Sequence, residues 1–172
     1  HLYALKKLGM NYILKDGYIL AKSKGKLKGT TIKFPKISVG ATENSIIAAC
    51  LAKGITILKN CAVEPEIKDL TNFLNLGGAN ITWKGRTCKI VGVTTLNKTE
   101  YSVMSDRIEA GTFCVAATIT GGNLDVLNFD AKIINTELNL LKKFGAKIKI
   151  YKKKLSIKGP KNIKSVTNIK TG

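Results

Sequence analysis

The segment from Lys36 to Gly54, KISVGATENSIIAACLAKG, is the part of this chain best suited to bind an anion. It opens with small and polar residues and continues as a helix that is apolar nearly all the way round. The free amides at the N-terminus of a helix carry a partial positive charge. Small side chains at Ser38, Val39 and Gly40 leave these amides accessible, and Lys36 adds a full charge. The pattern predicts a diphosphate or carboxylate site. The alternative is an ordinary capped helix whose serine satisfies the amides.

The cysteines and two glutamates suggest structural roles. The four cysteines show no Cys-x-x-Cys spacing and the chain has a single histidine, so we expect neither a metal site nor a disulfide framework. We expect reduced thiols packed in the core. Glu64 and Glu66 flank Pro65, which is typical of the first turn of a helix rather than of an acid–base pair. The cysteines are Cys50, Cys61, Cys88 and Cys114.

The chain is strongly basic, with 29 Lys and Arg against 11 Asp and Glu and a formal net charge of +18. Only Arg86 and Arg107 are arginines, whereas phosphate and base-edge recognition favours the arginine fork. Many lysines alternate with apolar residues, as in KIKI at residues 147–150, which is typical of a strand with one wet face. We therefore expect no nucleic-acid partner in the cell, and Lys147, Lys149 and Lys152 should be exposed on outer strands.

Length and hydropathy favour a globular protein. A chain of 172 residues fits one domain or two very small ones. No apolar run approaches the ~20 residues of a membrane span, and no charged-then-apolar leader opens the chain. We expect a cytoplasmic protein with no membrane partner.

Self-similarity divides the chain into repeats. Three stretches each contain the tail of an amphipathic helix, a glycine, an alternating strand, a polar turn and a second strand. The glycines, Gly9, Gly78 and Gly145, are spaced by 69 and 67 residues and provide the left-handed conformation that ends a helix. The stretches cover residues 5–23, 72–93 and 139–159.

Two further helices are predicted around residues 43–53 and 108–120, with apolar or small side chains on all sides. Since a helix without a polar face must be buried, we expect both to be buried on nearly all faces and to lie side by side. The repeat is then βαβαββ, and the predicted fold is α/β with helices inside and sheets outside. We expect one partial domain over residues 1–172. It divides into the last third of a first repeat (1–29), a second repeat (30–95), and a third repeat with a crossover strand (96–172).

Three motifs in this order closely resemble the bacterial UDP-N-acetylglucosamine enolpyruvyl transferases: SVGATEN (38–44), EPEIKDL (64–70) and DRIEAGTF (106–113). The resemblance covers essentially the whole chain. It implies a two-domain protein in which each domain is an inside-out α/β barrel of three repeats. It also implies transfer of an enolpyruvyl group from phosphoenolpyruvate to the 3-hydroxyl of UDP-N-acetylglucosamine in peptidoglycan synthesis, with no metal or organic cofactor.

Two groups of residues match functional positions of that family. The resemblance implies that Lys36, Ser38, Val39 and Gly40 hold the nucleotide and diphosphate, largely through main-chain amides, and that His1 ends the uridine-side stretch.

The second group opens the third repeat and faces the interdomain cleft in the family: Asp106, Arg107 and Glu109. The resemblance implies charge pairing or phosphate steering for this group. For Arg107 an interdomain or helix-capping ion pair is the better hypothesis.

The family's main catalytic residues have no match in these 172 residues. Its phosphoenolpyruvate-site Lys-Asn pair and loop cysteine precede the equivalent of His1, and its general-base aspartate lies beyond the equivalent of Gly172. We therefore predict a sugar-nucleotide half-site that is inactive alone, with UDP-N-acetylglucosamine, phosphoenolpyruvate and the remainder of the two-domain chain as partners. The alternatives are a non-catalytic binding or scaffold module of the same fold and a lysine-rich nucleic-acid-binding protein.

Overall fold

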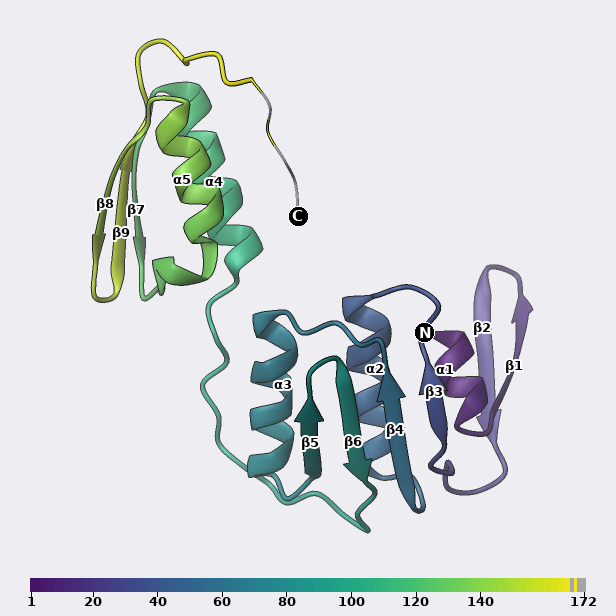
Figure 1. The fold of residues 1–172 in the computed structure, drawn as a ribbon. Helices are drawn as coiled ribbons and strands as arrows, with labels where there is room; N and C mark the ends of the chain where they lie inside the picture. The colour runs from purple at the N-terminus through teal and green to yellow at the C-terminus, as the bar shows by residue number, and fades with distance from the viewer. Residues whose placement is uncertain (168, 170–172) are drawn as a thin grey trace. The chain divides into compact units, whose positions relative to one another are not determined.

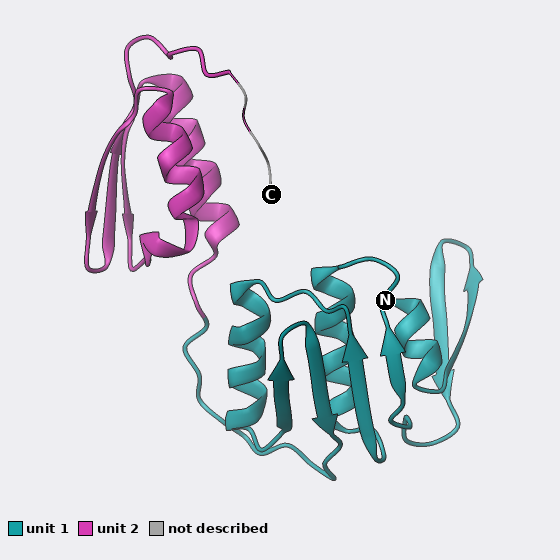
Figure 2. Ribbon diagram, viewed as in Figure 1, with its two compact units in different colours: residues 1–103 teal, residues 104–172 magenta. Residues whose placement is uncertain are grey.

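A computed structural model describes residues 1–167 and 169. The chain divides into two compact units, His1–Val103 and Met104–Gly172, coloured teal and magenta in Figure 2, and each is described by itself. The predicted division into one partial domain with boundaries near 30 and 96 stays a prediction. The predicted crossover near residues 168–172 lies, except for Ile169, outside the described residues.

The first unit begins with a short helix and a two-stranded antiparallel hairpin. Helix α1 (Leu2–Lys7) leads into β1 (Met10–Lys15) and β2 (Tyr18–Ser23). Asp16 and Gly17 form the turn between the strands, with φ of 51° and 79°. Positive φ at both central residues matches the right-handed twist of the flanking strands, which is why Asp-Gly suits this position.

The rest of the first unit is a four-stranded sheet with two helices on one face (Figure 1). The sheet has the order β3-β4-β6-β5, in which β3 runs parallel to β4 and the other neighbours are antiparallel. Side chains from alternate strand positions, among them Ile32, Leu58 and Ile90, are buried in the core with α2 and α3. The elements are β3 (Thr31–Lys33), α2 (Val39–Cys50), β4 (Ile55–Lys59), α3 (Pro65–Leu76), β5 (Asn80–Lys84) and β6 (Thr87–Val91).

The second unit repeats most of this arrangement. Its three-stranded antiparallel sheet has the order β7-β9-β8 and is covered on one face by α4 and α5 (Figure 1). Phe129, Leu138 and Leu155 are among the large buried side chains of its separate core. The elements are α4 (Arg107–Thr120), β7 (Asn123–Leu127), a 3-10 helix (Ala131–Ile134), α5 (Asn135–Lys143), β8 (Lys147–Tyr151) and β9 (Lys154–Lys158).

The repeat glycines are where the sequence predicts them. Gly9, Gly78 and Gly145 follow α1, α3 and α5 and have φ of 102°, 95° and 104°. Each lets the chain leave a helix and enter a hairpin in a conformation that other residues rarely adopt. The helix–glycine–hairpin part of the repeat is confirmed in all three copies.

The third copy differs from the prediction because it lacks its first strand. Within the described residues, none between Val91 and α4 forms a strand. Contacts to α3 hold this segment instead. The Tyr101 hydroxyl donates to Asp69 Oδ1 at 2.7 Å, and the Tyr101 ring packs on Phe73 with centroids 5.5 Å apart. These contacts keep the segment in the first unit, and in the part of the chain that the structure describes no counterpart of β3 pairs with β7.

The prediction that α2 and α4 are buried on nearly all faces is wrong within each unit. In α4, Ile108 and Phe113 are 61% and 54% exposed, and in α2 Ile47 is 51% exposed. Within its own unit, each of these helices is covered on one side by sheet strands and neighbouring helices, and its opposite apolar face is not covered. None of the described helices has the length and apolar character needed to cross a membrane.

Candidate functional site

The segment Lys36–Gly40 connects β3 to the N-terminus of α2. Ser38 has extended backbone angles (φ −149°, ψ 122°) and is the N-cap residue, whose Oγ accepts a hydrogen bond from the Ala41 amide at 3.3 Å. Its carbonyl oxygen accepts from the Thr42 amide at 3.0 Å and from Thr42 Oγ1 at 2.8 Å. Ser38 therefore performs the capping role that the sequence left open as an alternative.

Two amides of the first turn remain available beyond the cap. Within the described residues no acceptor is found for the amides of Val39 and Gly40, both half-buried. The first turn of α2 contains no acidic residue, whereas the first turns of α3, α4 and α5 each contain one. Lys36 is exposed just before the cap. The partial positive charge at the N-terminus of α2 is therefore not offset by a carboxylate in the first turn of that helix.

The imidazole of His1 lies against this turn. A Cβ placed on Gly40 would stand 2.8 Å from His1 Cε1 and 3.1 Å from Nε2, so the ring occupies the space that a side chain would fill. The Nδ2 atom of Asn44 contacts His1 Nδ1. The structure thus brings together His1 and Gly40, two residues that the resemblance assigns to the sugar nucleotide. It adds Asn44, which sequence reasoning missed although Asn44 lies one helical turn after Gly40.

The second predicted group lies in the other unit, at the start of α4. Asp106 is the N-cap, and its Oδ1 accepts from the amides of Ile108 at 2.7 Å and Glu109 at 3.1 Å. Asp106 and Glu109 both line a hollow of about 500 Å³ that also contains Phe113. Arg107 is the first helical residue and is half-buried. The structure brings these residues together and gives Asp106 a structural role.

Glu64 and Glu66 lie at the beginning of α3, as predicted. Glu64 is the N-cap residue and its Oε2 accepts from the Val63 amide at 2.7 Å, while Glu66 lies in the first turn. Pro65 occupies the first helical position, where its missing amide hydrogen costs nothing. Their position fits the interaction of carboxylates with the helix dipole.

All four cysteines are buried free thiols. Burial raises the pKa of Cys50 and of Cys61 to about 11, and it also raises the pKa values of Cys88 and Cys114. A thiol with so high a pKa is protonated at neutral pH and is a poor nucleophile. The prediction that these cysteines are core residues is confirmed.

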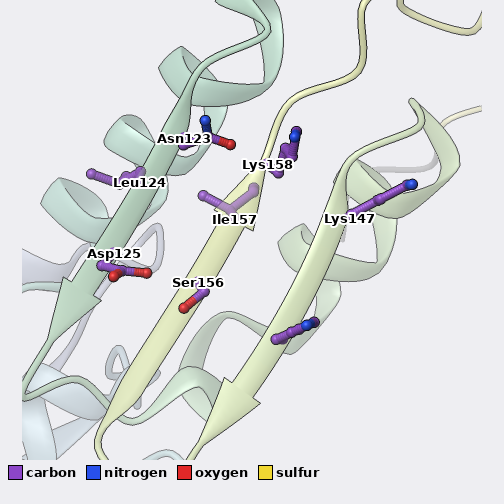
Figure 3. Close-up of a pocket in the computed structure, with 8 residues that line it drawn as sticks. Asn123, Leu124, Asp125, Lys147, Ser156, Ile157 and Lys158 are labelled. Atoms are coloured by element: carbon purple, nitrogen blue, oxygen red, sulfur yellow. The ribbon is translucent and has the colours of Figure 1, made fainter.

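A lysine-lined hollow of about 430 Å³ lies on the outer face of the β7-β9-β8 sheet, opposite the helices (Figure 3). Lys147 and Lys149 line it and are exposed, as is Lys152 in the following turn, which confirms the prediction for these three lysines. On the same sheet Lys154 pairs with Asp125 at 2.7 Å. The lysines that alternate with apolar residues thus lie on a solvated strand face.

The model of one protein family, described as EPSP synthase (3-phosphoshikimate 1-carboxyvinyltransferase), matches residues 1–171. The chain belongs to this family of carboxyvinyltransferases. Two curated relatives are named for a different substrate, UDP-N-acetylglucosamine. The UDP-N-acetylglucosamine 1-carboxyvinyltransferase of Pelagibacter ubique is 58% identical over 172 residues, which are 99% of this chain and 41% of that protein. The UDP-N-acetylglucosamine 1-carboxyvinyltransferase 1 of Caldanaerobacter subterraneus is 46% identical over 99% of this chain and 41% of that protein.

Solved structures share the fold at lower identity. The enolpyruvyl transferase NikO from Streptomyces tendae has a TM-score of 0.79 at 18% identity, over 93% of this chain and 41% of that one. An EPSP synthase from Acinetobacter baumannii has a TM-score of 0.66 at 21% identity, over 96% of this chain and 40% of that one. This chain therefore has the enolpyruvyl transferase fold and spans about two-fifths of the length of the proteins it matches.

Proposed function

We propose that this chain is part of an enzyme that transfers the enolpyruvyl group of phosphoenolpyruvate to the 3-hydroxyl of UDP-N-acetylglucosamine. The observation that carries the proposal is the 58% identity, over 99% of the chain, to a relative named for that acceptor. Its identity to an EPSP synthase structure is only 21%. The sugar nucleotide is therefore preferred over a shikimate phosphate as the acceptor.

The start of α2 supplies the half-site for the sugar nucleotide in this proposal. The amides of Val39 and Gly40 have no acceptor among the described residues, and no acid offsets the helix dipole in that turn. These features favour a diphosphate, which accepts hydrogen bonds from amides and is attracted by the nearby Lys36. His1, on the surface of the same turn, extends the half-site toward the uridine side.

The exposed apolar faces of α2 and α4 support a finer proposal for the fold. Ile47 on α2 and Phe113 on α4 are more than half exposed within the described chain. Covering such faces would contribute about 1.5–3 kcal/mol for each large side chain fully buried. We propose that in the complete domain both faces pack at the centre of an inside-out barrel, with the sheets and their lysines outside.

The main catalytic residues are assigned to the part of the protein outside this chain. The four cysteines are buried, with raised pKa values, and none suits attack on phosphoenolpyruvate. Asp106, Arg107 and Glu109 are proposed to face the interdomain cleft. The reaction as proposed uses no metal or organic cofactor, and it takes place in the cytoplasm as a step of peptidoglycan synthesis.

The test compares the full-length protein with the 172-residue chain. We expect phosphate release from phosphoenolpyruvate plus UDP-N-acetylglucosamine by the full-length protein and none by the chain alone, because acid–base and nucleophilic groups must lie within hydrogen-bonding reach of the reacting atoms. Gly40→Val in the full-length protein should weaken UDP-N-acetylglucosamine binding by about tenfold or more, with an unchanged thermal midpoint without ligand. Turnover by the chain alone would contradict the half-site assignment. Phosphate release with shikimate 3-phosphate and none with the sugar nucleotide would overturn the acceptor.

A further inference from the structure

We propose that Asn44 is a positioning residue that, with Gly40, holds the imidazole of His1 at the sugar-nucleotide site with its protonated nitrogen available to the ligand. The inference rests on the proposed function. Asn44 is not one of the residues that the resemblance assigns to substrate binding. Its basis is the packing of one side chain, His1, against two residues on the first turns of α2.

Gly40 and Asn44 lie four residues apart and so share one face of α2. The His1 ring lies over Gly40, where an added Cβ would come within 2.8 Å of Cε1 and 3.1 Å of Nε2. Any residue other than glycine at position 40 would therefore displace the ring. Position 40 must therefore be glycine to leave room for the His1 ring, and this reason is separate from the space that a phosphate needs.

The contact with Asn44 determines which ring nitrogen carries the proton. The side-chain nitrogen of asparagine only donates hydrogen bonds, so His1 Nδ1 must accept from Asn44 Nδ2. In the neutral ring the proton is then on Nε2, the nitrogen beside Gly40. The ring therefore presents an N–H donor beside Gly40, whose amide has no acceptor among the described residues.

Both side chains are exposed, so a ligand at the start of α2 has access to them. The hydrogen bond restricts rotation of the imidazole before the ligand arrives, which lowers the entropic cost of ordering it on binding. Asn44 is thus expected to influence the ligand through His1, with no bond of its own to the substrate.

The kinetic test uses variants of the full-length protein. We expect Asn44→Ala to raise KM for UDP-N-acetylglucosamine about 3- to 10-fold, with KM for phosphoenolpyruvate and kcat within about twofold of the unmodified protein. Asn139→Ala provides the matched control, since Asn139 is an exposed asparagine within α5 in the other unit. In a His1→Ala background, Asn44→Ala should have no further effect.

A spectroscopic test uses the 172-residue chain, whose single histidine gives one set of imidazole signals. In a long-range ¹H–¹⁵N spectrum of the neutral ring, the proton should lie on Nε2, and Asn44→Asp should shift it toward Nδ1 because a carboxylate only accepts.

The outcomes separate the two proposals. If His1→Ala raises KM for UDP-N-acetylglucosamine while Asn44→Ala does not, or if the two changes are additive, the positioning role is overturned and the proposed function stands. An unchanged ring tautomer in Asn44→Asp would also overturn it. If the unmodified full-length protein shows no reaction with UDP-N-acetylglucosamine, both the function and the inference fall.

Discussion

The starts of α2 and α4 occupy the same place in successive repeats but differ in charge. Ser38 and Asp106, their N-cap residues, are 68 residues apart, close to the spacing of the repeat glycines. Each cap side chain accepts hydrogen bonds from the first turn of its helix. At α4 the cap is a carboxylate and Glu109 adds a second, whereas the first turn of α2 has neither.

The difference shows how a repeat can keep a structural role and change a functional one. Capping requires only an oxygen acceptor, which serine and aspartate both provide. The charge of that acceptor determines what else the helix end attracts. Two carboxylates offset the dipole of α4 and repel an anion, while α2 keeps its dipole and has Lys36 nearby.

The largest effect is expected from giving α2 the charge of α4. Ser38→Asp in the full-length protein keeps a good cap, so the thermal midpoint without ligand should be unchanged or higher. A carboxylate about 6 Å from a diphosphate charge costs about 3 kcal/mol at an effective dielectric constant of 20, which lowers affinity for UDP-N-acetylglucosamine about 150-fold. Calorimetric titration measures the effect.

Thr136→Asp is the control for Ser38→Asp, because it adds the same charge to the first turn of α5 and should leave the titration unchanged. Equal affinity in the Ser38→Asp and unmodified proteins would mean that no anion binds at α2.

The regular part of this fold is predictable from the sequence because it depends on local signals. Gly78 and Gly145 end helices through their own backbone freedom, and Ser38 and Asp106 cap helices through neighbours a few residues away. Periodicity also distinguishes the core positions of β9, Leu155 and Ile157, from the other positions of that strand.

The contacts that sequence reasoning missed join residues far apart in the chain. Asn44 meets His1 across 43 residues, and Tyr101 meets Asp69 across 32. No periodicity encodes such pairs. The Tyr101 contact also accounts for the segment predicted to open the third repeat as a strand: among the described residues it packs on α3 instead of extending a sheet.

An equal or smaller loss of affinity is expected from removing the cation beside α2. Lys36→Ala in the full-length protein should weaken UDP-N-acetylglucosamine binding by about 1 to 3 kcal/mol, or about 5- to 150-fold, if the ammonium makes a charge-assisted contact with the diphosphate. The loss should shrink as salt rises, because salt screens an exposed charge. Titrations at low and high salt check both points.

Lys147→Ala serves as the control for Lys36→Ala because Lys147 lies on the outer sheet face of the other unit. An equal loss of affinity in both variants would indicate a general effect of net charge and would remove the special role of Lys36.

The smallest effects are expected from removing each cap. Ser38→Ala and Asp106→Ala should each lower the free energy of unfolding by about 0.5–2 kcal/mol. Asp106→Ala should cost more, because Asp106 Oδ1 accepts from two amides and adds a charge at the positive end of its helix, whereas Ser38 Oγ accepts from one amide at 3.3 Å. Urea unfolding measures the free energy of unfolding. Hydrogen exchange at the amides of Ala41 and Ile108, which donate to the two caps, shows whether the loss of protection is at the helix start. An equal cost would show that charge adds nothing to capping.

If Ser38→Ala lost stability while neither it nor Lys36→Ala altered the titration with UDP-N-acetylglucosamine, the start of α2 would be a capped helix like that of α4, and no functional difference would separate them.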